Sequence, residues 1–181
     1  MKETIFISGT PCVGKTTISE VLAEKLNCRL IKINELAIEN DFILGIDDEK
    51  GYKIIDIDKL NRKVNEIIAD SNELLIFEGH LTHLCKGADK LIILRVHPDI
   101  LKERLSARNY SDAKIRENLE AEAMGVCTDE AYEYYSDNIY EIDVSVLTVE
   151  ESVELIANII DDIVDFAPGE IDFMNWLMDN P

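Results

Sequence analysis

The 181-residue sequence predicts an α/β protein built on a parallel β-sheet. Short apolar runs alternate along the chain with segments in which apolar residues recur at helical spacing, which is the pattern of βαβ units. The run at 74–77 is nearly all apolar, as expected of a strand that is buried on both faces. A glycine-bounded loop follows the first run, and ligands of such sheets bind beyond the carboxyl ends of the strands. The length suits one compact domain.

Five apolar runs are the strand candidates, and polar or helical segments separate them. A helical pattern begins directly behind the first run, where Ile18, Val21, Leu22 and Leu26 recur at the spacing of one helix face. This order predicts that the first strand, the loop and a helix form one structural unit. The strand candidates are 4–8, 29–33, 74–77, 90–96 and 140–146.

The C-terminal part of the chain predicts one long helix and a tail. Thr148 and Glu151 have the spacing of a capping box, which marks the start of a helix at 149–164. The tail at 166–181 contains the single tryptophan, Trp176, and is a candidate for a short docked helix.

The charge balance is strongly acidic. The chain has 18 basic and 37 acidic residues, which give a formal net charge of −19. Such a surface repels nucleic-acid phosphates, so direct binding of DNA or RNA is disfavoured. It attracts a basic partner. Solubility or adaptation to salt explains the same composition, and the sequence leaves both explanations open.

The sequence has no signal for a membrane or for an oxidising compartment. No uncharged apolar run approaches the roughly 18 residues of a membrane span, and the first residues do not have the pattern of a signal peptide. The cysteines are scattered without CxxC spacing, which favours neither a zinc site nor a disulfide framework. A cytoplasmic location is the expectation. The cysteines are Cys12, Cys28, Cys85 and Cys127.

The loop after the first strand has the Walker A pattern. Gly9, Gly14, Lys15 and Thr16 fill G-x-x-x-x-G-K-[ST]. The glycines let backbone N–H groups turn toward phosphate oxygens, and the helix that follows presents its positive end to the same anion. Lys15 can reach the β- and γ-phosphates, and the Thr16 hydroxyl can bind Mg²⁺. The loop therefore predicts a nucleoside triphosphate with Mg²⁺, without distinguishing a kinase from an ATPase or a GTPase.

Two candidate catalytic residues follow the third strand. Glu78 ends a buried apolar run, where a Walker B carboxylate holds Mg²⁺ through water or orients a nucleophile. His80 is placed to polarise an attacking group or a water molecule. A solvated acid at a strand end and a structural histidine are the alternative interpretations. His80 and His83 have no third ligand nearby in sequence, so a metal site at the two histidines is rejected.

Three arginines form a further candidate group. Arg104 and Arg108 are four residues apart and share one helix face, and Arg116 follows a short polar break. Closing arginines stabilise the charge that develops during phosphoryl transfer. Ordinary surface pairing with the many acidic residues is the alternative interpretation.

Taken together, these segments resemble the adenylate kinase family, and in particular its small divergent archaeal and eukaryotic branch of the isoenzyme 6 type. The resemblance covers about 4–160 and rests on the Walker A loop, the strand-end "EGH", "KERLSARNY" and "KIRENLEAE". It implies a P-loop NTPase three-layer sandwich with five parallel strands in a domain at 1–165. It also implies a nucleoside monophosphate (NMP) binding insertion at about 32–55 and a short lid at about 107–117.

The resemblance also implies roles for individual residues. Arg104 and Arg108 match positions that contact the base and phosphates of ATP, and Asn34 begins the NMP segment. Glu78 and His80 match the acid and the histidine of the branch. Lys15, Glu78, His80 and Arg108 are thus the expected catalytic residues, and Thr16 and Glu78 the expected magnesium ligands. The residues expected to line the ATP phosphates are Gly9, Cys12, Gly14, Lys15, Thr16 and Thr17.

The sequence departs from the family at several positions. Cys12 replaces a usual glycine, which the loop tolerates if that residue has a negative φ, and Glu78 replaces an aspartate of the eukaryotic members. Ile38 occupies the place of one arginine that grips the AMP phosphate, and "HLTH" at 80–83 lacks the second. The candidates that could substitute for these arginines are Lys32, Lys53 and Arg95.

Three functions remain open at this stage. The first is an NMP kinase that transfers the ATP γ-phosphoryl to AMP or a related NMP. The second is an ATPase assembly factor, because members of the branch hydrolyse ATP and act in late maturation of the small ribosomal subunit and its 16S rRNA. The third is a nucleotide-binding module without turnover. The resemblance implies the basic small-subunit ribosomal protein uS11 as a partner, and the net charge of −19 agrees with a basic partner.

Overall fold

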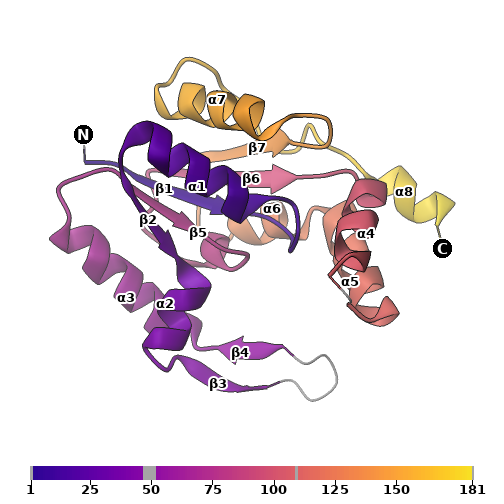
Figure 1. Ribbon diagram of the computed structural model, residues 1–181, viewed down its shortest axis with the longest axis horizontal. Coiled ribbons are helices and arrows are strands. Elements are labelled where there is room, and N and C mark those ends of the chain that lie inside the picture. The colour runs from indigo at the N-terminus through magenta and orange to yellow at the C-terminus, as the bar shows by residue number, and fades with distance from the viewer. Residues whose placement is uncertain (1, 47–51, 109, 181) are drawn as a thin grey trace.

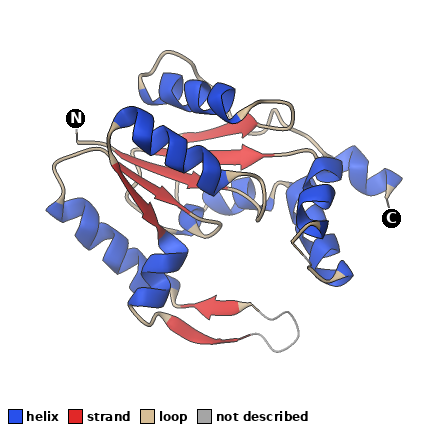
Figure 2. Ribbon diagram, viewed as in Figure 1, coloured by secondary structure: helices blue, strands red, loops and turns tan. Residues whose placement is uncertain are grey.

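The computed structural model describes residues 2–46, 52–108 and 110–180. Five strands form one parallel sheet in the order β2-β5-β1-β6-β7 (Figures 1 and 2), which confirms the predicted α/β fold. The last strand ends at residue 143 rather than at 146, and the other ends differ less from the prediction. The strands are β1 (Thr4–Ser8), β2 (Arg29–Lys32), β5 (Leu75–Glu78), β6 (Lys90–Arg95) and β7 (Ile139–Asp143).

The helices cover both faces of this sheet. They are α1 (Lys15–Leu26), α2 (Ile33–Glu39), α3 (Ile57–Asp70), α4 (Pro98–Ser106), α5 (Asp112–Met124), α6 (Val126–Ala131), α7 (Val149–Ile160) and α8 (Met174–Asp179). A 3₁₀ helix, η1 (Thr82–Leu84), follows β5, and the antiparallel pair β3 (Ile43–Ile46) and β4 (Lys53–Ile55) forms a separate hairpin.

Two apolar cores flank the sheet, because successive side chains of a strand point to opposite faces. Ile5 and Ile7 of β1 pack in the core that contains α1, α4, α5 and α7. Phe6, between them, packs in the second core with α2, α3 and α6. Its ring meets the edge of Phe77 at a centroid distance of 5.2 Å. The structure is therefore a three-layer sandwich with the sheet in the middle (Figure 2).

The predicted capping box of α7 is present. The Thr148 hydroxyl accepts from the Glu151 N–H at 3.1 Å, and the Thr148 N–H donates to the Glu151 carboxylate at 2.8 Å. These two bonds satisfy N–H groups that the first helical turn leaves without partners. The helix ends at Ile160, earlier than the predicted residue 164.

Two groups of elements extend beyond the ends and edges of the sheet. α4, α5 and α8 lie beyond the carboxyl ends of β6 and β7, whereas α2 and the β3–β4 hairpin lie below β2 in Figure 1. The predicted docked tail helix is confirmed as α8, whose buried Trp176 donates its indole N–H to Asp99 Oδ1 at 2.7 Å. Among the described residues, no helix is long and apolar enough to span a membrane.

Candidate active site

The loop between β1 and α1 requires glycine at two of its positions. A Cβ on Gly9 would lie 2.4 Å from the Leu94 carbonyl oxygen, and the φ of Gly9 is +135°. Gly14 has φ +118° directly before the first turn of α1. Both positions therefore suit glycine alone, because side chains are strongly disfavoured at such φ values. The loop approaches the neighbouring strand closely and points its backbone toward the end of the sheet.

Cys12 does not meet the condition expected from the sequence. Its φ is +70°, in the left-handed region, rather than negative. An L-residue there costs about 1–2 kcal/mol relative to its favoured region, and glycine avoids that cost. The loop still has its compact shape, so the strain at Cys12 is compensated by the packing around it.

Lys15 lies inside the loop. Its side chain is buried, and its Nζ donates to the carbonyl oxygens of Gly9 at 2.8 Å and Thr10 at 2.9 Å. Burial lowers the pKa of this ammonium, while the nearby Cys127 and Glu78 oppose that shift. The loop thus holds a positive charge beside the N–H groups that a phosphate needs.

The structure brings Thr16 and Glu78 together, although they are far apart in sequence. The Thr16 hydroxyl donates to Glu78 Oε1 at 3.2 Å. Burial raises the pKa of Glu78, and the Lys15 charge and the Thr16 hydrogen bond act against that rise. A hydroxyl and a carboxylate oxygen are the hard donors that Mg²⁺ prefers, and Mg²⁺ needs few protein ligands. The pair therefore fits a magnesium ion.

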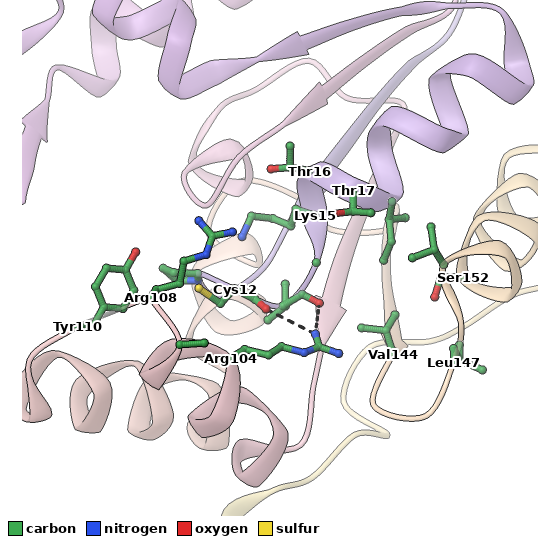
Figure 3. A pocket seen from close by; sticks show the side chains of 16 residues that line it. Cys12, Lys15, Thr16, Thr17, Arg104, Arg108, Tyr110, Val144, Leu147 and Ser152 are labelled. Atoms are coloured by element: carbon green, nitrogen blue, oxygen red, sulfur yellow. Dashed lines mark hydrogen bonds between the residues drawn. The ribbon is translucent and has the colours of Figure 1, made fainter.

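A cavity of about 560 Å³ lies over the loop (Figure 3). Arg104 Nη1 donates to the Val13 carbonyl oxygen at 2.8 Å, so this arginine braces α4 against the loop. The exposed Arg108 reaches toward Lys15 in the close-up view (Figure 3). Of the predicted phosphate-loop residues, Gly9 does not line this cavity, and the others do: Cys12, Gly14, Lys15, Thr16 and Thr17. The apolar and aromatic part of its wall comes from Tyr110, Val144, Leu147 and Val149.

A second cavity, of about 620 Å³, lies between the insertion and α5. Asn34 and His80 both line it, and the Asn34 amide nitrogen lies 3.4 Å from His80 Nδ1. Burial, and then the Lys15 charge, lower the pKa of His80 to about 4, so its ring is neutral at physiological pH. Pro11 lines both cavities, which therefore adjoin at the loop.

The cations proposed to replace the missing arginines differ in their surroundings. Arg95 is buried and donates to Glu122 at 2.9 Å and to Glu141 at 2.6 Å, so it is wrong as a phosphate ligand. Two equally buried carboxylates neutralise its charge. Lys32 forms an ion pair with Glu20 at 2.7 Å. Lys53 does line the second cavity.

Ile38 lies at the second cavity, whereas Arg116 lies away from the cavity over the loop. Ile38 lines the second cavity and is 48% exposed, so an apolar side chain occupies this part of the cavity wall. Arg116 faces away from the loop cavity, because it pairs with Glu120 at 2.5 Å and donates to the Asn180 carbonyl at 2.5 Å. Arg116 thus joins α5 to the tail.

A buried polar network behind the loop was not foreseen from the sequence. Glu122 of α5 accepts from the Thr10 hydroxyl, from Arg95 Nε and, at 3.0 Å, from the Val96 N–H. Glu122 is 1% exposed, so the loop residue Thr10 is tied to α5 through a carboxylate without access to water. The available signal was an acid next to the apolar residues Leu119 and Ala123 on one helix face.

His83 also has a role that the sequence did not reveal. Its buried ring contacts Ser8 Oγ through Nδ1 at 2.7 Å and Glu130 through Nε2 at 2.8 Å. Burial lowers the pKa of His83, and the Glu130 carboxylate opposes that shift. This histidine joins β1, η1 and α6, which makes it a structural connection next to the site.

Comparison with known proteins gives relatives along nearly the whole chain. Residues 5–125 match the family described as "AAA domain". A Methanothermobacter thermautotrophicus protein named "Putative adenylate kinase" is 38% identical over 174 residues, which are 96% of this chain and 99% of that protein. A Methanosarcina barkeri protein of the same name is 38% identical, with coverage of 94% and 97%.

Solved structures agree at the level of the fold. A shikimate kinase from Bacteroides thetaiotaomicron has a TM-score of 0.57 at 20% identity, covering 88% of this chain and 98% of that chain. A thymidylate kinase from Candida albicans has a TM-score of 0.54 at 15% identity, covering 88% and 91%. At these identities the likeness concerns the fold alone. The sequence identity to the archaeal proteins is higher and extends over nearly their full length, and the chain therefore belongs to the family whose members are named "Putative adenylate kinase".

Proposed function

We propose that this protein is an NMP kinase of the adenylate kinase type, which transfers the γ-phosphoryl group of ATP to AMP or a related NMP. The observation that carries the proposal is the pair of cavities that adjoin at Pro11, one over the phosphate loop and one beside His80. The first has the size and the cations for ATP, and the second has the size for an acceptor. The proposal is further supported by the name of the archaeal relatives.

Each residue near the loop has a distinct task in this proposal. Lys15 leaves the carbonyl oxygens that it now contacts and binds the β- and γ-phosphates. Arg108 approaches the transferred group from the exposed side, and Arg104 keeps the loop in shape. Mg²⁺ at Thr16 and Glu78 neutralises phosphate charge when it is bound. These contacts stabilise the charge that develops in the transition state, which is the main source of catalysis in phosphoryl transfer.

His80 and the insertion serve the acceptor. Because His80 is neutral, it offers one N–H donor without adding a charge, and it can orient a phosphate oxygen of the acceptor. We assign the insertion at 32–55 to acceptor binding, and the connection around 107–117 to closing the ATP cavity. The remaining tail at 166–181 has no assigned role in the reaction.

A coupled assay tests the proposal directly. ADP formation from ATP is measured alone and with AMP, CMP, GMP or UMP at saturating Mg²⁺. A kinase requires an acceptor, so the rate should rise at least tenfold with one of the four NMPs. Equal rates with and without every acceptor would reject the kinase, and the complete absence of ADP would favour a nucleotide-binding module.

ATP hydrolysis is the second candidate function, and one observation favours it. Among the described residues, no arginine lines the acceptor cavity. An acceptor phosphate would therefore bind less tightly, and water would compete for the γ-phosphoryl group. The same assay separates the two activities, because hydrolysis releases inorganic phosphate in proportion to ADP and does not depend on an NMP.

A partner of opposite charge is proposed for the acidic surface, with a cytoplasmic role in small-subunit maturation. Asp129, Glu133 and Asp137 are exposed acids. Other acids are engaged within the protein and do not contribute a free charge: Glu120, Glu122, Glu130 and Glu141. The acids at 47–50 lie outside the described residues. Binding to purified uS11 at low and high salt tests this role, and no complex at low salt with either ATP or ADP would reject it.

A further inference from the structure

One lysine that the proposed reaction has not used lies between the two cavities. Lys114 is in the first turn of α5, and the N–H of this residue is capped by the Ser111 hydroxyl at 3.3 Å. Its Nζ lies 4.2 Å from the centroid of the Tyr52 ring and 4.3 Å from that of the Tyr110 ring. Two aromatic rings thus hold one ammonium group in place.

The two rings belong to different cavities. Tyr110 lines the cavity over the phosphate loop, and Tyr52 lines the cavity beside His80. Lys114 itself lines neither cavity, but its contacts with both rings place its charge directly behind one wall residue of each cavity. The charge also acts on His80, since Lys114 is among the causes that lower the pKa of that histidine.

The ammonium group of Lys114 has no carboxylate partner among the described residues, and this points to an anionic ligand. The chain has 37 acidic residues, so pairing would be the ordinary outcome for a lysine. Ring faces attract an ammonium group but do not satisfy its N–H donors as a carboxylate does. The donors of Lys114 therefore stay available for phosphate oxygens.

We infer that Lys114 is a further catalytic residue, which binds the phosphoryl group while it moves between the nucleotides. The inference rests on the proposed kinase function. In that reaction an acceptor phosphate oxygen forms a bond to the γ-phosphorus, and the bond from that phosphorus to the β,γ-bridging oxygen breaks. ADP leaves with the electron pair of the broken bond, and the acceptor becomes a nucleoside diphosphate. Lys114 supplies positive charge on the acceptor side, where Ile38 stands in place of an arginine.

Three variants separate charge from packing. Lys114→Met keeps the apolar stem between the rings and removes the charge, and Lys114→Arg keeps a charge. Lys86→Met is the matched control, because Lys86 also lies over a ring, at 5.6 Å, but that ring, Tyr134, lines neither cavity. If the Met variant does not fold, Lys114→Gln provides the same test. Melting temperatures near that of the wild type establish that the variants are folded.

The first measurement is the steady-state rate of transfer. Lys114→Met should lower kcat/KM for the acceptor by at least 30-fold, with the affinity for ATP alone changed less than threefold. Lys114→Arg should recover most of the loss, and Lys86→Met should match the wild type. A purely structural lysine would instead lower the melting temperature and leave kcat/KM of the folded fraction unchanged, and that result would overturn the inference.

The second measurement does not need turnover. Calorimetry uses diadenosine pentaphosphate, which carries two adenosines joined by five phosphates and so offers one nucleoside to each cavity. It should show at least tenfold weaker binding to Lys114→Met than to the wild type. If the wild type transfers to no NMP, the kinase proposal fails while this titration still tests Lys114. Equal affinity of the two proteins, or no binding by the wild type, would overturn the role of Lys114.

Discussion

The two sides of the site are built differently. On the ATP side, buried polar groups tie the phosphate loop to the rest of the protein. Arg104 joins the loop to α4, and Glu122 joins Thr10 to α5 and to Arg95. Each of these interactions joins elements that are far apart in sequence. The side chains of the central strand β1 next to them are buried. This side is therefore formed before any nucleotide binds.

Among the residues that the structure describes, the acceptor side rests on fewer buried contacts. Its hairpin exposes large apolar side chains, with Leu44 at 65% and Ile46 at 61%, and α2 exposes Ile38 at 48%. The contacts toward α5 come from Tyr52, which donates to Glu117 at 3.2 Å and packs against Lys114. Segments with little buried apolar surface open at low cost in free energy. The comparison therefore divides the proposed site into a rigid ATP side and an acceptor side that moves more easily.

Breaking the hydrogen-bond network of Glu122 behind the loop should have the largest effect on the free energy of unfolding. Glu122→Ala leaves Arg95 with one carboxylate in a buried site and removes the acceptor of Thr10. The loss of one partner of a buried ion pair costs about 3–5 kcal/mol of unfolding free energy. Urea unfolding measures this loss. Glu120→Ala, whose partner Arg116 is partly exposed, is the control and should cost less than about 1 kcal/mol. Similar losses in the two variants would contradict the comparison.

Lys15→Ala tests the ATP side at the level of chemistry. The substitution removes the cation that binds the transferred phosphate, so turnover should fall by about 10²–10³-fold, or about 2.7–4 kcal/mol. The melting temperature should change little, because the Lys15 ammonium bonds to loop carbonyl groups and is not one of the apolar residues of the two cores. The coupled assay gives the rate. Near-normal turnover in the folded variant would show that the phosphate loop is not the site of the reaction.

Ile38→Arg should strengthen the acceptor side. The new guanidinium would reach a cavity that lacks an arginine among the described residues, and a charged hydrogen bond is worth about 1.5–3 kcal/mol. We expect KM for AMP to fall about tenfold. Ile54→Arg is the matched control, because Ile54 lies on the same insertion but does not line the cavity. An equal fall in both variants would mean that added charge, and not position, is responsible.

The sequence predicted the ATP side better than the acceptor side, for a physical reason. Local motifs specify local geometry: the glycine spacing predicted the loop, and the apolar run before Glu78 predicted an acid at the end of a buried strand, which the structure places beside Thr16. The network of Glu122 with Thr10 depends on how α5 folds back behind the loop. A single acidic residue in a helical pattern does not indicate that contact. The same limit explains why the sequence alone left Arg95 among the candidates for a phosphate ligand.

The outcome at Cys12 shows the limit at a single residue. The pattern allows any residue at this position of the loop, so the sequence did not determine its φ. In the structure the turn needs a left-handed residue there, with φ +70°. The turn geometry is set by the contacts of Gly9 and Lys15 on either side. The packing of the loop therefore overrides the preference of Cys12 for a negative φ.

The smallest expected effect is a pH dependence on the acceptor side. The pKa of His80 is lowered from its ordinary value of 6.5 to about 4, mainly by burial. Between these pH values the unfolded chain binds a proton at this position that the folded protein does not bind. Stability from this group is therefore complete above about pH 6.5 and is lost as the pH falls toward 4. Because His80 is only partly buried, solvent screens its charge and keeps the effect modest.

His80→Gln separates this contribution from those of the other titrating groups. Glutamine retains a hydrogen-bonding side chain for Asn34 but does not bind the proton. His83, whose pKa burial also lowers, is present in both proteins and cancels in their difference. Unfolding free energies measured from pH 7 to pH 4 should fall less steeply for the variant, so the two curves approach each other as the pH falls. Parallel curves would mean that His80 is protonated equally well in the folded and unfolded states, and its assignment as a neutral donor to the acceptor phosphate would then fail.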